Sequence, residues 1–450
     1  MIPAESFWAA NLHTAPEGES ITRILAAAIA AVEPGAAVRK FVQREGDALS
    51  ISGQTYNLST FRRVYLLGIG KAAPAMSAAL AEILGETLAA GLVIAKHIPP
   101  ESINHSPYSI IQGGHPIPDE RSLLAGEKVV EFVSALGPND LLLCLISGGG
   151  SALVTAPVDG VSLADLQSLT SALLACGARV DEINVLRRRL DRIKGGGVAR
   201  LSNGAAIISL ILSDVVGNRL EAIASGPTAP DPSTHADALS IIAKYGLEHQ
   251  IPLTLNHALF SSPETPKPGD PLFEHVQNVI VGSNLSAAQA ALKQAEEEGF
   301  HPYLLRADLQ GEARDSAFEL ATFLRQARQT GDPVPPPACI VAGGETTVTL
   351  RGDGQGGRNT ELALAAVTEL ADFPGVMLVT LATDGEDGPT NAAGAVVTGE
   401  TYSRARALGM NPTEYLNRND SYSFFEALGD LLKPGPTGTN VNDLTFLFTF

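Results

Sequence analysis

Residues 64–74 read VYLLGIGKAAP, an apolar run followed by a glycine-rich turn and the start of an amphipathic segment. Gly68 and Gly70 match the G-x-G-x-x-A turn that opens a dinucleotide-binding domain. Lys71 adds an ammonium group at the mouth of the following helix, where backbone N–H groups and the helix dipole already favour an anion. The turn is therefore compatible with a nicotinamide cofactor and with the phosphates of a phosphoryl-transfer reaction.

The end of the next strand bears on that choice. A dinucleotide site requires an acidic residue about 20 residues further on, where it binds the ribose hydroxyls. Here the second apolar run, 91–95, is followed by Lys96. A lysine weakens the case for NAD but is compatible with the 2′-phosphate of NADP. Hydride transfer stays open at this point, as does a glycine turn that serves only close helix–strand packing.

The same pattern recurs through the first half of the chain. Apolar runs that end in glycine or serine alternate with amphipathic stretches. The runs are 64–70, 91–95, 140–146 and 205–212, and the expected helices are 71–84, 120–136, 162–175 and 181–194. Fully apolar strands indicate burial on both faces, so we expect an α/β fold with a Rossmann-like, mostly parallel sheet covered by helices. Ligands of such sheets bind at the carboxyl ends of the strands.

A change in composition indicates a second domain. The stretches 226–234 and 261–271 are rich in proline. We place the domain boundary near residue 240, which gives domains 1–240 and 241–450. Later strands are expected at 278–282, 302–305, 339–342 and 376–382, helices at 285–298, 312–328 and 359–371, and a hairpin arm at 345–357. This pattern predicts a second, smaller α/β domain, with the active site in the cleft between the two domains.

The charge balance excludes some partners. The chain has 31 Lys and Arg against 49 Asp and Glu, a formal charge of −18. Such a surface repels a phosphate backbone, so we do not expect nucleic acid as a partner. The first residues lack a basic and apolar leader, and no apolar run reaches about 18 residues, so we expect neither a signal peptide nor a membrane partner.

The cysteines indicate the compartment. Cys144, Cys176 and Cys339 are odd in number and far apart, which predicts buried thiols in a reducing compartment, the cytoplasm. The sequence does not fix the oligomeric state, and a homodimer is one arrangement that it allows.

The segment ISGGGSAL, 146–153, is a candidate anion site. It follows a buried strand, and its glycines expose backbone N–H groups to a carboxylate or phosphate. A nucleophile elbow needs G-x-S-x-G, which this segment lacks, so a serine hydrolase is disfavoured. The candidate residues are Ser147, Gly148, Gly149, Gly150 and Ser151.

Two further candidates follow in the first half. In RRRLDRIKGGG, 187–197, the basic residues cannot share one helix face, so most are expected to be solvated. Lys194 precedes a glycine triplet and could close an anion site. Asp214 follows the strand 205–212, where it is either a catalytic or metal-binding carboxylate or a loop cap.

Three loops of the second half carry the remaining candidates: 341–348, 354–359 and 382–390. Arg358 follows glycines and begins a helix, where a guanidinium can bridge phosphate oxygens. Carboxylates suit Mg²⁺. Taken singly these acidic loops are more often solvated turns, but together with the arginine they favour phosphoryl transfer. The expected metal ligands are Glu345, Asp384 and Asp387.

The chain resembles one known family over nearly its whole length. The matching blocks are GIGKAAPAM, GGHPIPDE, LISGGGSALV, INVLRRRLDRIKGGGVA, LSDVVGN, ASGPTAPDP, GGETTVTLRGDGQGGRNTELALA, ATDGEDGPTNAAGAVV and GPTGTNVNDL. They are similar to the glycerate 2-kinase family of the MOFRL type, some members of which are labelled hydroxypyruvate reductase. The resemblance implies ATP-dependent phosphorylation of D-glycerate at its 2-hydroxyl with Mg²⁺, and it implies that Lys71 and Arg358 are a catalytic pair.

These expectations give each candidate a role. Lys71 and Arg358, one from each domain, stabilise charge on the transferring phosphoryl group, and Asp214 orients the 2-hydroxyl. Residues 147–151 and Lys194 hold the glycerate carboxylate. The nucleotide is expected to contact Gly68, Gly70, Asn284, Gly344, Glu345, Asp384 and Gly385. The alternative is an NAD(P)H-dependent hydroxypyruvate reductase.

Overall fold

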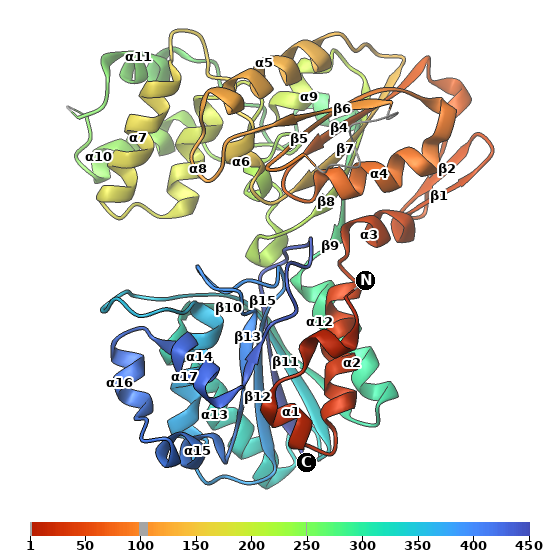
Figure 1. Ribbon diagram of the computed structural model, residues 1–450. Helices are drawn as coiled ribbons and strands as arrows, with labels where there is room; N and C mark the ends of the chain where they lie inside the picture. The colour runs from red at the N-terminus through yellow and green to blue at the C-terminus, as the bar shows by residue number, and fades with distance from the viewer. Residues whose placement is uncertain (1, 99–106, 249) are drawn as a thin grey trace. The chain divides into compact units, whose positions relative to one another are not determined.

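The chain folds into two compact units (Figure 1). The computed structural model describes residues 2–98, 107–248 and 250–450. The first unit, here called the central unit, is formed by Pro34–Val281. The second, the terminal unit, combines Met1–Glu33 with Gly282–Phe450.

The central unit is built on a six-stranded sheet of order β6-β5-β4-β7-β8-β9. Its strands are β4 (Arg63–Ile69), β5 (Leu88–Ala95), β6 (Tyr108–Gln112), β7 (Asp140–Ser147), β8 (Ala206–Leu212) and β9 (Val276–Gly282). The pairs from β6 through β8 are all parallel. In chain order this is the arrangement 3-2-1-4-5-6 of dinucleotide-binding sheets. The expected Rossmann-like, mostly parallel sheet is confirmed.

Helices cover both faces of this sheet, as expected for strands that are apolar throughout (Figure 1). Helix α4 (Ala73–Leu84) packs on one face, and α5 (Glu120–Ser134) and α9 (Gly197–Leu201) cover the other. A helical lobe beside the sheet has its own apolar core. It comprises α7 (Leu163–Ala175), α8 (Val180–Arg189), α10 (His235–Lys244) and α11 (Leu253–Ser261). The unit also contains α3 (Pro34–Phe41), α6 (Gly150–Leu153), β1 (Val42–Glu45), β2 (Ala48–Ile51) and β3 (Gln54–Asn57).

The terminal unit contains a mixed sheet of order β10-β11-β15-β12-β13-β14. Its strands are β10 (His301–Glu312), β11 (Ala338–Thr347), β12 (Val376–Ala382), β13 (Gly394–Thr398), β14 (Leu431–Leu432) and β15 (Asp443–Thr449). β10 and β11 are parallel, whereas β15 runs antiparallel to both of its neighbours, β11 and β12. The expected second α/β domain is confirmed.

Two groups of helices cover the terminal sheet on opposite faces (Figure 1). On one face α2 (Gly18–Ala30) packs against α12 (Asn284–Glu297). On the other face α13 (Ala313–Thr330) and α14 (Arg358–Glu369) contribute to an apolar cluster of buried residues. The remaining helices are α1 (Ala10–Thr14), α15 (Thr401–Ala407), α16 (Pro412–Asn417) and α17 (Ser421–Leu428).

The structure divides the chain at 33/34 and 281/282, whereas we expected one boundary near 240. The expected first strand of the second domain, 278–282, is instead β9 at the edge of the central sheet. Its Asn278 side chain exchanges hydrogen bonds with Thr228, one of 2.8 Å and one of 3.1 Å. The N-terminal helix α2 packs on α12 of the terminal unit. Both differences arise from contacts between segments that are far apart in the sequence.

Two local expectations were also wrong. Residues 348–357 contain no strand, so the hairpin arm does not form; β11 ends at Thr347, and Gly352 and Gly354 pack closely on the backbone of Arg418. All three cysteines are free thiols, but only Cys144 and Cys339 are buried. Cys176 is exposed because it caps α7 outside the apolar core of the helical lobe.

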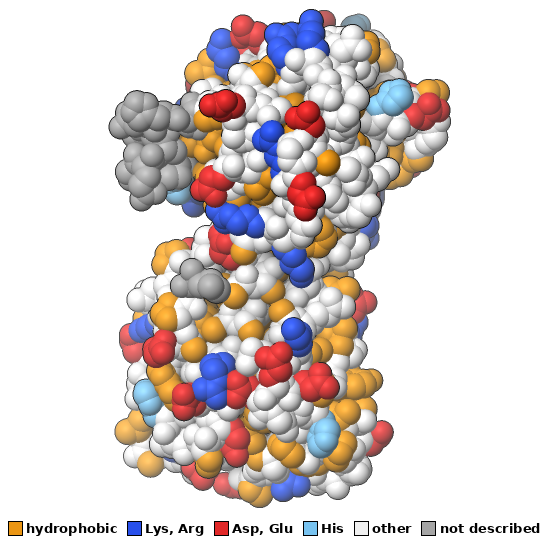
Figure 2. Space-filling model, turned by 90° about the vertical axis from the view of Figure 1, so that its right-hand side faces the viewer, with side chains coloured by type: hydrophobic (Ala, Val, Ile, Leu, Met, Phe, Trp, Pro, Cys, Tyr) orange, Lys and Arg blue, Asp and Glu red, His pale blue; other side chains and the backbone are white. Residues whose placement is uncertain are grey.

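Acidic and basic side chains are interspersed on the face that Figure 2 presents. Ion pairs join opposite charges elsewhere in the structure as well: Arg23 pairs with both Glu19 and Glu298. Among the described residues that this face shows, the basic side chains do not form one continuous surface. Within the described part of the chain, no single helix is long and apolar enough to cross a membrane.

Candidate functional site

The candidate site of the central unit lies where β4 and β7 end side by side. These strands are the first and fourth of the sheet, so their carboxyl ends form the topological switch point, where open α/β sheets bind ligands. The Lys71 backbone N–H donates to the Gly148 carbonyl at 3.0 Å. The Ala72 N–H donates to the buried Ser147 hydroxyl, also at 3.0 Å. The two loops predicted from the sequence are therefore joined by direct hydrogen bonds.

Gly70 allows this joint to form. Its φ is 134°, and a Cβ atom there would lie 2.2 Å from Ser147 Oγ. Any larger residue would separate the two loops. Gly68, by contrast, lies within β4 against Ser77 and Val93, so its position indicates strand packing.

Lys71 is exposed and extends past the glycine loop. Carbon atoms of its side chain would lie 3.2 Å from a Cβ at Gly149. Its ammonium group makes no hydrogen bond or ion pair with any described residue, so it is free to bind an anion.

His115 is a site residue that the sequence analysis did not single out. Its ring approaches the same glycine, 3.2 Å from a Cβ at Gly149. Burial lowers the pKa of His115 to about 4, and the charges of Lys71 and Lys96 add to this effect. The imidazole is therefore neutral at neutral pH and can accept a hydrogen bond. His115 lies in the block GGHPIPDE, which the sequence analysis names as part of the family resemblance but for which it gives no site residue.

Asp214 also lies at this loop. A Cβ at Gly148 would be 2.0 Å from Asp214 Oδ2, so only glycine permits the carboxylate to approach so closely. The residue follows β8, the neighbour of β7, which explains its position. The structure thus brings together Lys71, residues 147–150 and Asp214, as the sequence predicts.

The last residue of the loop, Ser151, forms a hydrogen bond of 2.8 Å with Ser225. Ala224 and Ser225 have φ angles of 49° and 61°, which L-residues seldom adopt. The Ala224 methyl group would be 2.8 Å from a Cβ at Gly150. Such strained residues cluster at functional sites, which supports a functional role for the loop.

The Lys194 side chain is held by hydrogen bonds inside the central unit. Its ammonium is buried and donates to Asp191, to the Val154 carbonyl at 2.9 Å and to Thr155 Oγ1 at 3.2 Å. All three donors are used, so the structure favours a packing role over the expected anion site. Burial lowers the pKa of Lys194.

The expectation that most of the neighbouring arginines are solvated was wrong. Arg188 is buried and bonds Asp231 at 2.8 Å, and Arg189 is buried and bonds Glu264 at 2.6 Å. Each carboxylate comes from a later segment of the helical lobe, which sequence spacing does not reveal.

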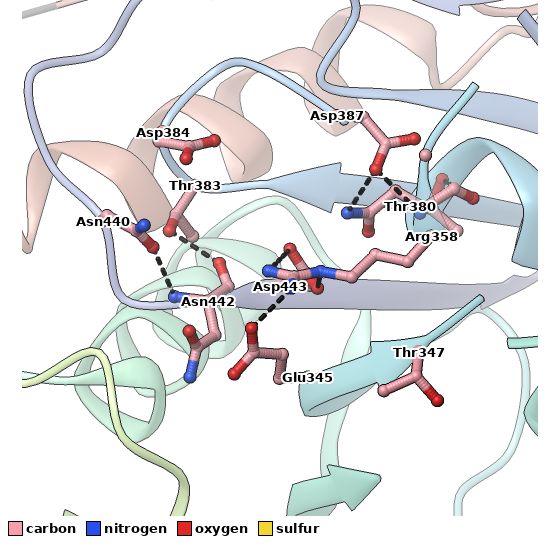
Figure 3. A network of polar contacts seen from close by, with 12 residues as sticks. Glu345, Thr347, Arg358, Thr380, Thr383, Asp384, Asp387, Asn440, Asn442 and Asp443 are labelled. Atoms are coloured by element: carbon pink, nitrogen blue, oxygen red, sulfur yellow. Dashed lines mark hydrogen bonds and ion pairs between the residues drawn. The ribbon is translucent and has the colours of Figure 1, made fainter. Parts of the chain in front are cut away.

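Arg358 is the centre of a second network, in the terminal unit (Figure 3). Its guanidinium donates to both carboxylate oxygens of Asp443 and to Glu345. Asp443 is buried, whereas Glu345 and Arg358 are partly exposed. Burial lowers the pKa of Arg358 and the two carboxylates raise it, with a net upward shift. Burial also raises the pKa of Asp443, while the guanidinium opposes this.

The antiparallel direction of β15 explains this convergence. Asp443 begins β15 and pairs with Gly344 of β11 and Ala382 of β12, so it lies at the carboxyl ends of both strands. Arg358 begins α14 and reaches the same edge. Asp443 lies in the block GPTGTNVNDL, in which the sequence analysis named no residue.

Asp387 does not have the expected metal-binding arrangement. One of its oxygens accepts hydrogen bonds from the backbone and side chain of Asn359, and the other from those of Thr360. It is buried and caps the first turn of α14, where a carboxylate is favoured by the helix dipole.

The three expected metal ligands do not converge. Figure 3 shows the carboxylates of Glu345, Asp384 and Asp387 apart from one another, with Arg358 and Asp443 between them. Within residues 2–98, 107–248 and 250–450, no group of three or more His, Cys, Asp or Glu side chains is placed to hold a metal ion. The predicted three-carboxylate site is therefore absent from the described part of the chain.

The expected nucleotide contacts are close to the Arg358 network but have packing roles of their own. The Asn284 amide donates to the carbonyls of Val441 and Asp443, at 3.0 Å and 2.8 Å, and so fixes the start of β15. Gly344 lies against the Leu309 backbone, and Gly385 against the Gly435 carbonyl. Asp384 accepts a hydrogen bond from the Glu386 N–H within its own turn.

Comparison with known proteins identifies the family. Residues 20–260 match a family model described as a domain of unknown function, DUF4147, and residues 338–443 match the MOFRL family. The chain is 42% identical to the D-glycerate 2-kinase of Thermotoga maritima over 85% of this chain and 89% of that protein. An Agrobacterium vitis protein, provisionally named hydroxypyruvate reductase, is 40% identical over 85% of this chain and 86% of its own length.

A solved structure agrees with these relatives. The crystal structure of a Thermotoga maritima glycerate kinase superposes with a TM-score of 0.83 at 38% identity, and the match covers 95% of this chain and 98% of that one. The two matched family models agree with this assignment, and so does the position of the candidate site at the adjacent ends of β4 and β7. The chain belongs to the glycerate 2-kinase family of the MOFRL type.

Proposed function

We propose that this protein is an enzyme that phosphorylates D-glycerate at its 2-hydroxyl, with ATP as the phosphoryl donor and 2-phosphoglycerate and ADP as products. The observation that carries the proposal is the free Lys71 ammonium beside a glycine loop at the switch point of the sheet. A relative that is 42% identical is named D-glycerate 2-kinase, which supports the same reaction.

In this proposal the central unit binds the reacting groups. Phosphoryl transfer asks the protein mainly for positioning and charge stabilisation. Lys71 neutralises charge on the transferring phosphoryl group. Asp214 lies against Gly148 and the neutral His115 against Gly149, where each can accept the proton of the 2-hydroxyl. Arg358 is the second charge donor, as the family resemblance implies.

Among the described residues, the carboxylates that we expected to bind magnesium do not form a site for that ion. Asp387 uses both oxygens at the helix, and Glu345 is already paired with Arg358. We therefore assign no step to a protein-bound ion. Where Mg²⁺ takes part, it is a partner of the ATP phosphates, to which this ion binds readily while keeping its waters.

One structural observation favours a second reaction. The strand order 3-2-1-4-5-6 is that of dinucleotide-binding sheets. NAD(P)H-dependent reduction of hydroxypyruvate is therefore the alternative, and Lys96 would contact the 2′-phosphate of NADPH. A Lys96→Glu variant would then change the preference between NADPH and NADH.

The first experiment is an assay with D-glycerate, ATP and Mg²⁺ that is coupled to enolase in the absence of phosphoglycerate mutase. A signal means that 2-phosphoglycerate forms directly, which supports both the reaction and the position. ADP release without an enolase signal places the phosphate on another group or on water. If only hydroxypyruvate with NADPH is turned over, the proposal is wrong and the alternative holds.

A further inference from the structure

Arg187 differs from the two arginines that follow it in α8. Arg188 and Arg189 each form an ion pair with a carboxylate. Arg187 is half-buried and forms neither a hydrogen bond nor an ion pair with any residue that the structure describes. Burial lowers its pKa, and no carboxylate opposes that effect. A guanidinium in this position lacks the partners that buried cations normally have.

The helix explains why Arg187 is held there. Ile183 lies four residues before it in α8, and Leu190, the residue that caps the end of α8, lies three residues after it. Both are buried in the core of the helical lobe. Arg187 thereby lines a small cavity.

The cavity adjoins the glycine loop. Ser151, the last residue of that loop, lines it together with Thr155, Gln167 and Lys194. Lys194 is neutralised by Asp191, so the uncompensated charge in the cavity is the single positive charge of Arg187. Leucine and isoleucine side chains form much of the remaining wall, and they strengthen the attraction for one negative charge.

The size of the cavity limits the ligand. Its volume is about 30 Å³, and one water needs about 10–15 Å³ on the same scale. This suits a group of two or three polar atoms and excludes a nucleoside. A guanidinium presents parallel N–H donors that match the two oxygens of a carboxylate.

We propose that Arg187 and the Ser151 hydroxyl form a receptor for the carboxylate of a short 2-hydroxy acid. This inference rests on the proposed function and names its specificity-determining residue. In a 2-hydroxy acid the hydroxyl-bearing carbon is bonded to the carboxyl carbon. The side chain of Lys71 lies against Gly149, two residues before Ser151, so the cavity and Lys71 adjoin the same glycine loop.

The test compares D-glycerate with its neutral amide, glyceramide, as substrates of the full-length protein. Arg187→Met is expected to lower kcat/KM for D-glycerate by about 100-fold, because a charge-assisted bond to substrate is lost. The same variant should change kcat/KM for glyceramide by less than about threefold and leave the KM for ATP unchanged. Arg187→Lys should restore part of the D-glycerate activity, since it returns the charge without the two-pronged geometry.

Arg179→Met is the matched control. Arg179 is exposed at the start of the same helix, where it pairs with Asp181, and its replacement should leave both substrates unaffected. Equal losses for D-glycerate and glyceramide in Arg187→Met, or no loss for either, would overturn the proposal.

A binding experiment separates this inference from the proposed reaction. Calorimetric titration of D-glycerate into the wild-type protein and into Arg187→Met needs no turnover. Binding that is present in the wild type and lost in the variant supports the receptor even if no kinase activity is found. Absence of D-glycerate binding to the wild type, or equal binding to both proteins, contradicts it.

Discussion

Lys71 and Arg358 are two cations that the sequence assigns to one task, and the structure gives them opposite surroundings. Lys71 lies beside a glycine loop and has no partner among the described residues. Arg358 is bonded to two carboxylates, one of them buried. Lys71 can bind an anion without breaking an existing contact. Arg358 must first break at least one of its ion pairs.

The difference indicates two ways of holding a positively charged side chain in position for an anion. At Lys71 the backbone supplies order, since Ser147 and Gly148 hold the turn and leave the ammonium free. At Arg358 the carboxylates supply order, because they fix the guanidinium before any ligand binds. A fixed donor loses little conformational freedom when it binds, but its existing ion pairs weaken its attraction for phosphate.

The largest effect is expected when the Arg358 network is broken. Arg358→Met should reduce kcat by about 1,000-fold, the lower end for an arginine that stabilises a phosphoryl transition state. It should also destabilise the protein by about 2 kcal/mol because Asp443 then keeps an uncompensated buried charge; this lies below the range for fully buried pairs because Arg358 is partly exposed. Steady-state kinetics and urea unfolding measure the two effects.

The double variant Arg358→Met with Asp443→Asn separates stability from catalysis. Removing the buried charge should recover most of the lost stability and none of the activity. If activity returned together with stability, Arg358 would be a structural residue and its assignment as a charge donor would be wrong.

A smaller effect is expected at the free cation. Lys71→Met should lower kcat by about 100-fold, the value typical of one preorganised charge donor. Its thermal stability should be unchanged, because the lysine ammonium has no partner among the described residues to lose. Lys128→Met is the matched control, since Lys128 is an exposed lysine that pairs with Glu131 at the surface. Full activity of Lys71→Met would contradict the proposed role.

The sequence predicted the parts of the fold that depend on local pattern. The apolar runs and their glycines predicted β4 and β7 and the sheet edge at which their carboxyl ends meet, where open α/β sheets bind ligands. It did not place β9 or α2, because their positions depend on Thr228 and α12, which are distant in the chain. The change in composition therefore predicts a boundary near residue 240, whereas the units divide at 33/34 and 281/282.

The candidate site shows the same limit. Lys71, Asp214 and residues 147–150 were predicted because each directly follows an apolar strand. Asp387 has the same signal but serves as a helix cap, and only the positions of Asn359 and Thr360 reveal this. Asp443 begins a strand and does not follow one, so a search of strand ends overlooked it.

A third prediction tests whether Asp387 is a cap or a metal ligand. Asp387→Asn should destabilise the protein by about 1–2 kcal/mol, because the amide presents N–H groups to the N–H of Thr360 in place of an acceptor. The Mg²⁺ concentration needed for half-maximal activity should stay unchanged. A severalfold rise in that concentration with unaltered stability would restore Asp387 as a metal ligand.

The smallest expected effect is on the pKa of His115, which depends on the positive charge of the nearby Lys71. Its pKa lies near 4 in the folded protein, against an ordinary value of 6.5, mainly through burial and further through Lys71 and Lys96. Between these two values the unfolded chain binds more protons, so the contribution of His115 to stability is complete above pH 6.5 and is lost as the pH falls toward 4.

Lys71→Met should raise the pKa of His115 by removing one of the two nearby ammonium groups. Titration of the His115 ring followed by NMR measures this directly, with exposed His257 as the internal control. In urea unfolding, the stability of the wild type relative to His115→Asn should be greater at pH 7 than at pH 5, by less than about 1 kcal/mol for a half-exposed group. A His115 pKa that does not respond to Lys71→Met would mean that the Lys71 ammonium points away from the ring. The Lys71 ammonium would then lie outside the site formed by the glycine loop.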